Sequence, residues 1–407
     1  MKILMLSPWL PYPPNWGFAK RVFHMLEVLG KRHEVTLLAY AANDEDHESA
    51  RVLRQFCAAV HTLPAPTFAL GKRLAQLASV ASLSSFQRQT IYTPAMQAKL
   101  DELTAAAPFD IIHVESSQLA CYRFDPRSVM VLDEHNIEYE LYYRMYQTET
   151  SLARRWFNWV EYSKFKREET ASWRASDGTV MTSQREADLL AEIVPEVPTA
   201  VVPNAVDTDF FAPSSSPVDP DTVVLTGLMK YRPNVDGALF FVQDVLPRIL
   251  QQRPNATFYI VGGEAPPEVL RLASRHVIVT GRVDDVRPYV HKAAVFAVPL
   301  RMGSGTRLKV LEGLSMGRPM VSTALGCEGI DVVHGRHLLI ADTADAFADA
   351  VLQLMTQPEL ARQLSEQGRA LMLARYRWEH AVEALEAFYR RLQPAVGALP
   401  SRRQRTR

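Results

Sequence analysis

The chain has 407 residues, of which 47% are hydrophobic and 22% charged, a composition typical of globular proteins. Its 45 Lys and Arg residues balance 45 Asp and Glu residues, which argues against a chain-wide attraction to nucleic acid. Three scattered cysteines argue against a disulfide framework or a zinc cluster. The short apolar start and the absence of a run of about 18 apolar residues argue against a signal peptide and a membrane span. We therefore expect a cytoplasmic protein of two domains.

The first half of the chain alternates between strand and helix patterns. An apolar run at residues 2–7 is followed by a proline-rich loop, a segment with helical spacing at 17–32 and a second apolar run at 33–40. This order predicts a strand–helix–strand unit with a parallel sheet. Further apolar runs ending in polar residues predict strands at 110–115, 129–135, 178–183 and 199–204.

Residues 151–170 interleave aromatic and basic side chains. A helix of this composition suits an anionic membrane surface. Alternatively, the helix packs its aromatic side chains inward and its charges are simply solvated. The residues concerned are Arg154, Arg155, Lys164, Lys166 and Arg167, with Trp156, Phe157, Trp159, Tyr162 and Phe165.

The second half repeats the same rhythm after a connection at residues 201–221, where four prolines and three consecutive serines occur. Helical patterns occupy 235–252, 306–317 and 377–392. The fold class predicted is α/β, with two Rossmann-like doubly wound domains facing a cleft. We expect domains at 1–205 and 206–375, a helix at 376–394 that returns to the first domain, and a disordered basic tail at 395–407. Strands are predicted at 222–228, 256–263, 276–281, 295–300, 318–323 and 337–341.

A glycine-rich turn at residues 301–322, RMGSGTRLKVLEGLSMGRPMVS, runs directly into a predicted helix that begins near Thr306. Glycines leave backbone amides accessible, and a helix N-terminus favours anions. Arg307 and Lys309 lie where cations oppose the helix dipole unless an anion is bound. Glu312 could accept hydrogen bonds from ribose hydroxyls. The pattern predicts a nucleoside-diphosphate site; the alternative is an ordinary loop with solvated basic residues.

Several ordered segments resemble GT-B glycosyltransferases, in particular the retaining group called family 4, or glycosyl transferases group 1. The turn at 301–322 resembles their donor signature, and residues 201–211, VVPNAVDTDFF, resemble their hinge. The resemblance implies sugar transfer from a nucleotide-sugar substrate with retention of configuration, without a metal or other cofactor. Further matching segments are 11–26, 110–116, 281–300 and 376–389.

The resemblance also suggests roles for individual residues. Glu312, the second Glu of a family pair, would bind the ribose, whereas Ser304 stands where the family has the first Glu, which contacts hydroxyls of the transferred sugar. Leu228 stands where the family has an Arg of its diphosphate clamp, so we expect Arg307 and Lys309 to rebuild part of that clamp. Donor binding is assigned to Gly17, Lys230, Arg232, Arg282, Val283, Gly303, Ser304, Gly305, Thr306, Leu308 and Glu312.

Catalytic roles are assigned to Glu115, His135, Arg307 and Lys309. Glu115 occupies a position where the family often has a histidine, and His135 ends the next predicted strand. We expect both to face the sugars, with Asp133, Glu134 and Asn136 beside His135; the alternative is a network that caps loops. His113, within its strand, is expected to be structural.

The expected function is transfer of a hexose to a lipid-linked or cell-surface polysaccharide precursor, on the inner face of the membrane. The partners expected are the donor, the acceptor and an anionic membrane surface, and no nucleic acid. Alternatives are a GT-B nucleotide-sugar epimerase and a catalytically silent nucleotide-sugar-binding module. A dinucleotide oxidoreductase is excluded because no Gly-x-Gly-x-x-Gly follows the first strand.

Overall fold

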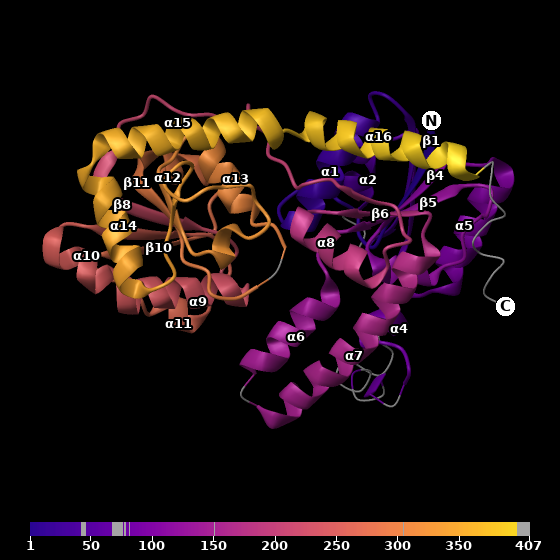
Figure 1. The fold of residues 1–407 in the computed structure, drawn as a ribbon, viewed down its shortest axis with the longest axis horizontal. Helices are drawn as coiled ribbons and strands as arrows, with labels where there is room; N and C mark the ends of the chain where they lie inside the picture. Colours follow the sequence, from indigo (N-terminus) through magenta and orange to yellow (C-terminus); the bar gives the residue numbers. More distant parts are fainter. Residues whose placement is uncertain are drawn as a thin grey trace. The chain divides into compact units, whose positions relative to one another are not determined.

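The computed structural model describes residues 1–41, 46–66, 76, 79–80, 82–149, 151–303 and 305–396. The chain divides into two compact units (Figure 1). Unit 1 consists of Met1–Pro203 together with the segment from Trp378 onward, and unit 2 consists of Asn204–Arg377.

Unit 1 is built on a seven-stranded parallel sheet in the order β3-β2-β1-β4-β5-β6-β7. Its central strands are buried on both faces, which explains their uninterrupted apolar runs. The predicted strands omitted β3, a sheet-edge strand whose mixed sequence AVHTLP is only partly buried. The strands are β1 (Lys2–Ser7), β2 (Glu34–Ala41), β3 (Ala59–Pro64), β4 (Ile111–Glu115), β5 (Val129–Glu134), β6 (Gly178–Met181) and β7 (Thr199–Val201).

Helices cover the sheet of unit 1, and the last of them comes from the end of the described chain. Helix α16 packs against α1 and lies so close to β6 that a Cβ on Gly178 would stand 2.6 Å from the Phe388 ring. The helices are α1 (Gly17–Leu29), α2 (Asp46–Leu53), α4 (Phe86–Ile91), α5 (Pro94–Ala106), η1 (Ser117–Cys121), α6 (Glu138–Thr148), α7 (Leu152–Ala175), α8 (Gln184–Ile193) and α16 (Trp378–Val396).

Unit 2 is built on a six-stranded parallel sheet in the order β10-β9-β8-β11-β12-β13. In both sheets the strand order reverses beside the first strand, as in doubly wound Rossmann folds, so the predicted fold class is confirmed. The strands are β8 (Asp219–Thr226), β9 (Thr257–Val261), β10 (Val277–Gly281), β11 (Ala293–Val298), β12 (Met320–Ser322) and β13 (Leu339–Ile340).

The helix expected over 235–252 is interrupted by a π-helical turn, η2 (Phe241–Val245). Pro247 follows that turn and cannot donate a backbone hydrogen bond, so a wider turn accommodates it. The remaining helices of unit 2 are α9 (Arg232–Phe240), α10 (Leu246–Gln252), α11 (Pro267–Leu270), α12 (Arg287–Lys292), α13 (Leu308–Ser315), η3 (Leu325–Cys327), α14 (Ala344–Thr356) and α15 (Pro358–Arg375). Among the described helices, none is both long and apolar enough to cross a bilayer.

Candidate functional site

The glycine turn of unit 2 connects the carboxyl end of β11 to α13. Gly303 and Gly305 have φ angles of 113° and 74°, in the left-handed region that glycine adopts without strain. A Cβ on Gly303 would stand 3.1 Å from Nη2 of Arg307 and 3.4 Å from the Tyr231 hydroxyl. The bare turn therefore lies against a guanidinium and a phenol. Ser304, between the two glycines, lies outside the described residues.

Lys309 extends from α13 to the end of the first strand of unit 2. Its Nζ donates a hydrogen bond to Oδ1 of Asn234 at 2.7 Å, and the Asn234 amide donates to the Leu228 carbonyl at 2.9 Å. Gly227, directly after β8, has a φ of 145°, and a Cβ there would stand 2.8 Å from Lys309 Nζ. The ammonium therefore sits at the strand switch point, where open α/β sheets bind ligands.

The electrostatics of this position favour an anion. The pKa of Lys309 falls to about 7, chiefly because the surrounding protein removes water from the ammonium; the Glu312 carboxylate acts in the opposite direction, and the positive Arg307 adds a smaller lowering effect. Arg307 is itself buried and stands at the N-terminal cap of α13. Two cations at a helix N-terminus repel one another and the helix dipole, so a bound diphosphate would stabilise both.

Other residues predicted to bind the donor are distributed around unit 2. Lys230 and Arg232 are exposed, and Lys230 Nζ lies 2.9 Å from Glu264 Oε2 in solvent. Arg282 is exposed near the carboxyl end of β9, where a Cβ on Gly263 would approach it to 3.2 Å. Val283 follows it in the same loop. Thr306, Leu308 and Glu312 are partly buried along the turn and the first half of α13.

A buried polar network occupies the carboxyl edge of the sheet in unit 1. Nη2 of Arg21, on α1, donates to both oxygens of Asp133 at 3.1 and 2.9 Å. His113 Nε2 lies 3.2 Å from Glu115 Oε1, and its Nδ1 is 2.7 Å from the hydroxyl of Tyr389 on α16. All five side chains are inaccessible to solvent. His113 is thus held inside unit 1, as expected for a structural residue.

His135 carries this network to the surface. Its Nε2 lies 2.6 Å from Glu115 Oε2, and its ring stacks on Phe18 with centroids 4.7 Å apart. The side chain is 13% exposed, whereas that of Glu115 is fully buried. A buried carboxylate that binds a partly exposed histidine orients the ring. Gly17, next to Phe18, begins α1 and is exposed.

In this network, pairing with opposite charges affects the pKa values more strongly than burial does. Burial alone would lower the pKa of His113, but the carboxylates of Glu115 and Asp133 raise it to about 9. Burial would raise the pKa of Glu115, yet the two histidines hold it below its ordinary value. For Asp133 the Arg21 guanidinium has the same lowering effect. At neutral pH the network therefore contains two carboxylates balanced by buried cations.

The expectation that Glu134 lies beside His135 with Asp133 is wrong. Successive side chains of a strand point to opposite faces of the sheet, so Asp133 faces α1 while Glu134 faces α7. Glu134 accepts hydrogen bonds from Trp173 Nε1 at 2.9 Å and from the Ser117 amide at 3.2 Å. Burial raises its pKa to about 8. Asn136 donates to Glu138 Oε1 at 3.3 Å.

Four residues of these two clusters were not assigned from the sequence: Arg21, Tyr389, Tyr231 and Asn234. For Arg21 a signal exists, because it precedes Met25 and Val28 by four and seven residues and all three are buried on α1. A charged residue on the apolar face of a helix indicates a buried partner. The other three carry no comparable local signal.

One group of described residues has metal-ligand geometry: His113, Glu115 and Asp133 each place a ligand atom within 4.8 Å of the others. The Arg21 guanidinium already occupies both oxygens of Asp133. Because an internal cation neutralises the group, the three residues fit an ion-pair network better than a metal site.

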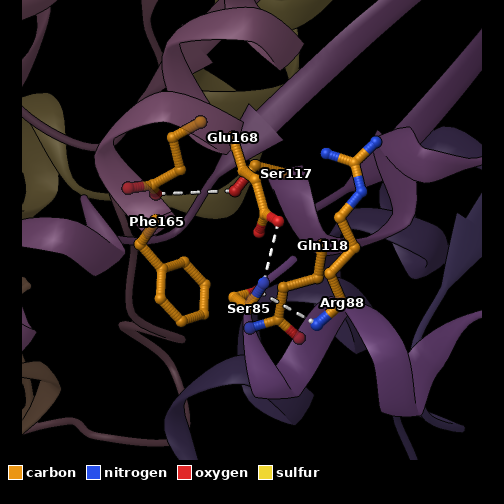
Figure 2. Close-up of a pocket in the computed structure, with 7 residues that line it drawn as sticks. Ser85, Arg88, Ser117, Gln118, Phe165 and Glu168 are labelled. Atoms are coloured by element: carbon orange, nitrogen blue, oxygen red, sulfur yellow. Dashed lines mark hydrogen bonds between the residues drawn. The ribbon is translucent and has the colours of Figure 1, made fainter. Parts of the chain in front are cut away.

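A small pocket between α4, η1 and α7 is shown in Figure 2. Its polar groups bind one another: the Ser85 amide donates to Glu168 at 2.8 Å, and Ser117 Oγ lies 3.5 Å from Glu169 Oε1. These bonds fasten α7 to its neighbours, so the pocket has a structural role.

Family models match both units. Residues 17–210 match the model described as Glycosyltransferase Family 4, and residues 220–357 match the model described as Glycosyl transferases group 1. An uncharacterized 44.6 kDa protein of the cps region of Klebsiella pneumoniae is 22% identical over 86% of this chain and 90% of its own. A GDP-mannose-dependent alpha-(1-6)-phosphatidylinositol monomannoside mannosyltransferase of Mycobacterium tuberculosis is 27% identical over 53% of this chain and 63% of its own.

Solved structures show the same fold. A sucrose-phosphate synthase from Thermosynechococcus elongatus superimposes with a TM-score of 0.72 at 18% identity, over 97% of this chain and 100% of the other. Anabaena HepE, crystallised in complex with UDP, superimposes with a TM-score of 0.67 at 14% identity, over 98% and 100%. With the two family models, which together extend from residue 17 to residue 357, these likenesses show that the chain is a GT-B nucleotide-sugar glycosyltransferase of family 4, the glycosyl transferases group 1.

Proposed function

We propose that the protein transfers a hexose from a nucleoside-diphosphate sugar to a lipid-linked or cell-surface polysaccharide precursor, with retention of anomeric configuration and without a metal. The observation that carries the proposal is the gathering of Gly227, Gly303, Arg307 and Lys309 at the carboxyl edge of the sheet in unit 2. It combines bare backbone, two cations and a helix N-terminus.

In this proposal the diphosphate binds between the glycine turn and Lys309. The diphosphate adds a negative charge near Lys309 to that of Glu312. It restores the full charge of the ammonium, because a neighbouring negative charge raises a lysine pKa. Arg307 contributes a second cation from the helix cap. Glu312, one turn further along α13, accepts hydrogen bonds from the ribose hydroxyls, as the family resemblance implies.

The same groups would accelerate the reaction. When the bond between the anomeric carbon and the diphosphate breaks, negative charge accumulates on the leaving phosphate. Cations fixed in advance in partly desolvated surroundings stabilise that charge more than water does, without reorganising. Lys309 and Arg307 meet this requirement, since one is partly and the other almost fully buried.

For unit 1 we propose that His135 contacts a sugar hydroxyl, with Glu115 orienting its ring. An imidazole directly after β5 can donate a hydrogen bond to a sugar hydroxyl. The short contact between His135 Nε2 and Glu115 leaves Nδ1 as the nitrogen available to a ligand.

The relatives support the acceptor class. The mycobacterial relative is named for transfer to a phosphatidylinositol mannoside, and the Klebsiella relative is named for its cps region. A lipid-linked acceptor would place the reaction at the inner face of the cytoplasmic membrane, with this chain bound peripherally.

The proposal is tested by replacing Lys309 with Met and measuring nucleoside-diphosphate binding by calorimetry, with UDP and GDP as the ligands. A hydrogen bond to a charged group contributes about 1.5–3 kcal/mol, so affinity should fall roughly 10- to 100-fold. The matched control is Lys292→Met, because Lys292 is exposed and lies 3.9 Å from Asp219 at the start of β8, away from the glycine turn. Equal affinities of the two variants and the wild type would contradict the proposed site.

Transfer itself is tested by incubating the protein with nucleotide sugars and lipid-extract acceptors. Release of nucleoside diphosphate together with a glycosylated lipid supports the proposal. An isomeric nucleotide sugar formed without an acceptor would instead indicate an epimerase, and binding without any turnover would indicate a silent module.

A further inference from the structure

Helices α6 and α7 form a hairpin that extends from the body of unit 1 (Figure 1). Aromatic rings join their inner faces: Tyr142 stacks on Phe165 with centroids 4.9 Å apart, and Tyr143 lies 5.2 Å from Tyr162. These rings follow the inward packing that an ordinary helix pair would show. The two helices are therefore joined through their inner faces.

The outer face of α7 is different. Leu152 is 82% exposed, Trp156 55% and Trp159 49%. Residues separated by four and seven positions share one face of a helix, so the three side chains form a continuous stripe. Tyr143 and Met145 of α6 are exposed as well. Large apolar side chains gathered on a solvent-exposed element indicate a surface that binds something.

The charges of α7 are sorted by sign. Its three carboxylates, Glu161, Glu168 and Glu169, are at most 9% exposed. Each accepts hydrogen bonds from backbone amides at the N-terminus of another helix: Glu161 and Glu168 bind amides at the start of α4, and Glu169 binds two at the start of α6. Negative charge is thereby removed from the outer face.

The exposed charges of α7 are all positive: Arg154, Arg155, Lys166, Arg167 and Arg174. Lys164, by contrast, is buried and donates to the Ser79 carbonyl at 2.6 Å. Arg154 and Arg155 stand at the tip, directly beside the exposed stripe. On α6, Glu140 is neutralised by Arg185 at 2.7 Å. Glu149, the C-terminal cap of α6, adds one carboxylate near the tip and accepts a hydrogen bond from the Ser151 amide at 3.0 Å. With Arg154 and Arg155 beside this one carboxylate, the tip combines tryptophans with an excess of positive charge.

We propose that this tip, defined by Leu152, Arg154, Arg155, Trp156 and Trp159, docks the protein on an anionic lipid bilayer. Tryptophan is favoured at the interface between lipid headgroups and hydrocarbon, and arginine binds lipid phosphates. The carboxylates of α7 are buried while its exposed charges are basic, and this distribution favours an anionic ligand. Charge complementarity therefore favours an anionic membrane over a neutral protein partner. The inference rests on the proposed function, in which a lipid-linked acceptor is presented at a bilayer.

The test is co-sedimentation of the full chain with vesicles of phosphatidylcholine alone or mixed with phosphatidylglycerol. We expect binding to the mixed vesicles only, weakening as salt increases. Each basic residue near an anionic surface contributes about 1 kcal/mol, or about fivefold in affinity. Removing two positive charges with R154Q/R155Q should therefore weaken binding roughly 25-fold. The matched control R174Q removes a charge at the opposite end of α7, which lies about 30 Å away by helix geometry, and should leave binding within about fivefold.

The apolar stripe is tested with W156S/W159S. The two native tryptophan side chains are 55% and 49% exposed, so we expect their replacement to leave the fold intact. This variant should lose quenching of tryptophan fluorescence by brominated lipids, whereas Leu270→Ser, an exposed residue of unit 2, should keep it. Absence of vesicle binding at low salt would overturn the inference. So would concentration-dependent dimerisation that W156S/W159S abolishes, because the stripe would then bind a second copy.

Binding of UDP and GDP, measured in parallel without vesicles, separates this inference from the proposed function. Loss of vesicle binding with intact nucleotide binding contradicts the docking surface alone. Vesicle binding without nucleotide binding supports the docking surface and contradicts the donor site.

Discussion

The surroundings of Lys309 strongly alter its chemistry. Desolvation and the neighbouring Arg307 lower its pKa to about 7, so at neutral pH about half of the molecules carry a neutral amine there. A diphosphate would favour the charged form and raise the pKa again. Nucleotide binding should therefore be linked to proton uptake above pH 7.

This linkage has a definite sign. Below pH 7 the ammonium is already protonated in the free protein, so binding takes up no proton at Lys309 and affinity is maximal there. Above pH 7 a proton must be acquired on binding, so the affinity for UDP or GDP should fall by up to tenfold per pH unit until the pKa of the bound state is reached. Calorimetry at pH 8 in buffers of different ionisation enthalpy measures the uptake directly. Lys309→Met should abolish it, and an unchanged uptake in that variant would assign the proton to another group.

Glu115 illustrates how one carboxylate can serve two partners. One oxygen faces His113 in the interior and the other binds His135 near the surface. Both histidines lower the pKa of Glu115 against the effect of burial. One carboxylate thus connects the accessible histidine to groups that solvent does not reach.

At the scale of elements, the carboxyl ends of β8 and β9 approach unusually closely. Gly262 has a φ of 153°, and a Cβ there would stand 1.9 Å from the backbone oxygen of Gly227. Since Gly227 also borders Lys309, the position of the ammonium depends on two strands ending in contact. Glycine is therefore required at residue 262, both because a Cβ would clash with the backbone and because the φ angle is positive.

We expect Gly262→Ala to lower the free energy of unfolding of unit 2 by about 3 kcal/mol or more, because a backbone clash adds to conformational strain of about 1–3 kcal/mol. Gly281→Ala is the matched control: its φ is 70°, and nothing lies within 4 Å of the added Cβ. That variant should show the strain alone, about 1 kcal/mol. Denaturant unfolding of both variants measures the difference, and equal effects would argue against the close contact.

Helix α7 acts as a support for its neighbours. Buried glutamates usually destabilise a protein. Those of α7, however, accept hydrogen bonds from backbone amides at the starts of α4 and α6, which have no acceptor within their own helices. The Ser85–Glu168 bond appears in Figure 2. The exposed charged residues of the helix are consequently all basic.

At the scale of the whole chain, the segment after unit 2 completes unit 1. Tyr389 and His113 are separated by 276 positions in sequence, yet their side chains meet at 2.7 Å in the interior. The C-terminal helix therefore contributes directly to the network that holds Glu115 and His135. Its loss would leave a buried imidazole nitrogen without its partner.

Tyr389→Phe should lower the free energy of unfolding of unit 1 by about 1–3 kcal/mol, the effect of leaving a buried polar group unsatisfied. Because His113 then loses one fixed contact, the NMR signals of its imidazole should also shift. Tyr376→Phe removes a comparable hydroxyl, which accepts a hydrogen bond from the Asp331 amide at 2.8 Å within unit 2, and should leave the His113 signals unchanged. Unaltered His113 signals in both variants would show that Tyr389 does not influence the network.

Much of the fold was predictable because strand and helix patterns are local. The apolar runs at 2–7 and 222–228 and the helical spacing at 17–32 reflect burial imposed by each element itself. The omitted strand β3 and the π turn before Pro247 show the limit: an edge strand lacks a clear pattern, and a local distortion does not alter hydrophobic periodicity. Most donor residues were proposed from motif resemblance, and their roles remain predictions.

The sequence by itself determined the alternation of strands and helices, the doubly wound fold class and the location of the glycine turn in the chain. Only the tertiary structure decided which side chains meet: Asp133 but not Glu134 joins His113, Lys309 but not Lys230 reaches the end of β8, and Trp156 and Trp159 point outward. The reason is physical. Secondary structure follows from the periodicity of neighbouring residues, whereas a contact depends on how distant segments pack, which no local pattern encodes.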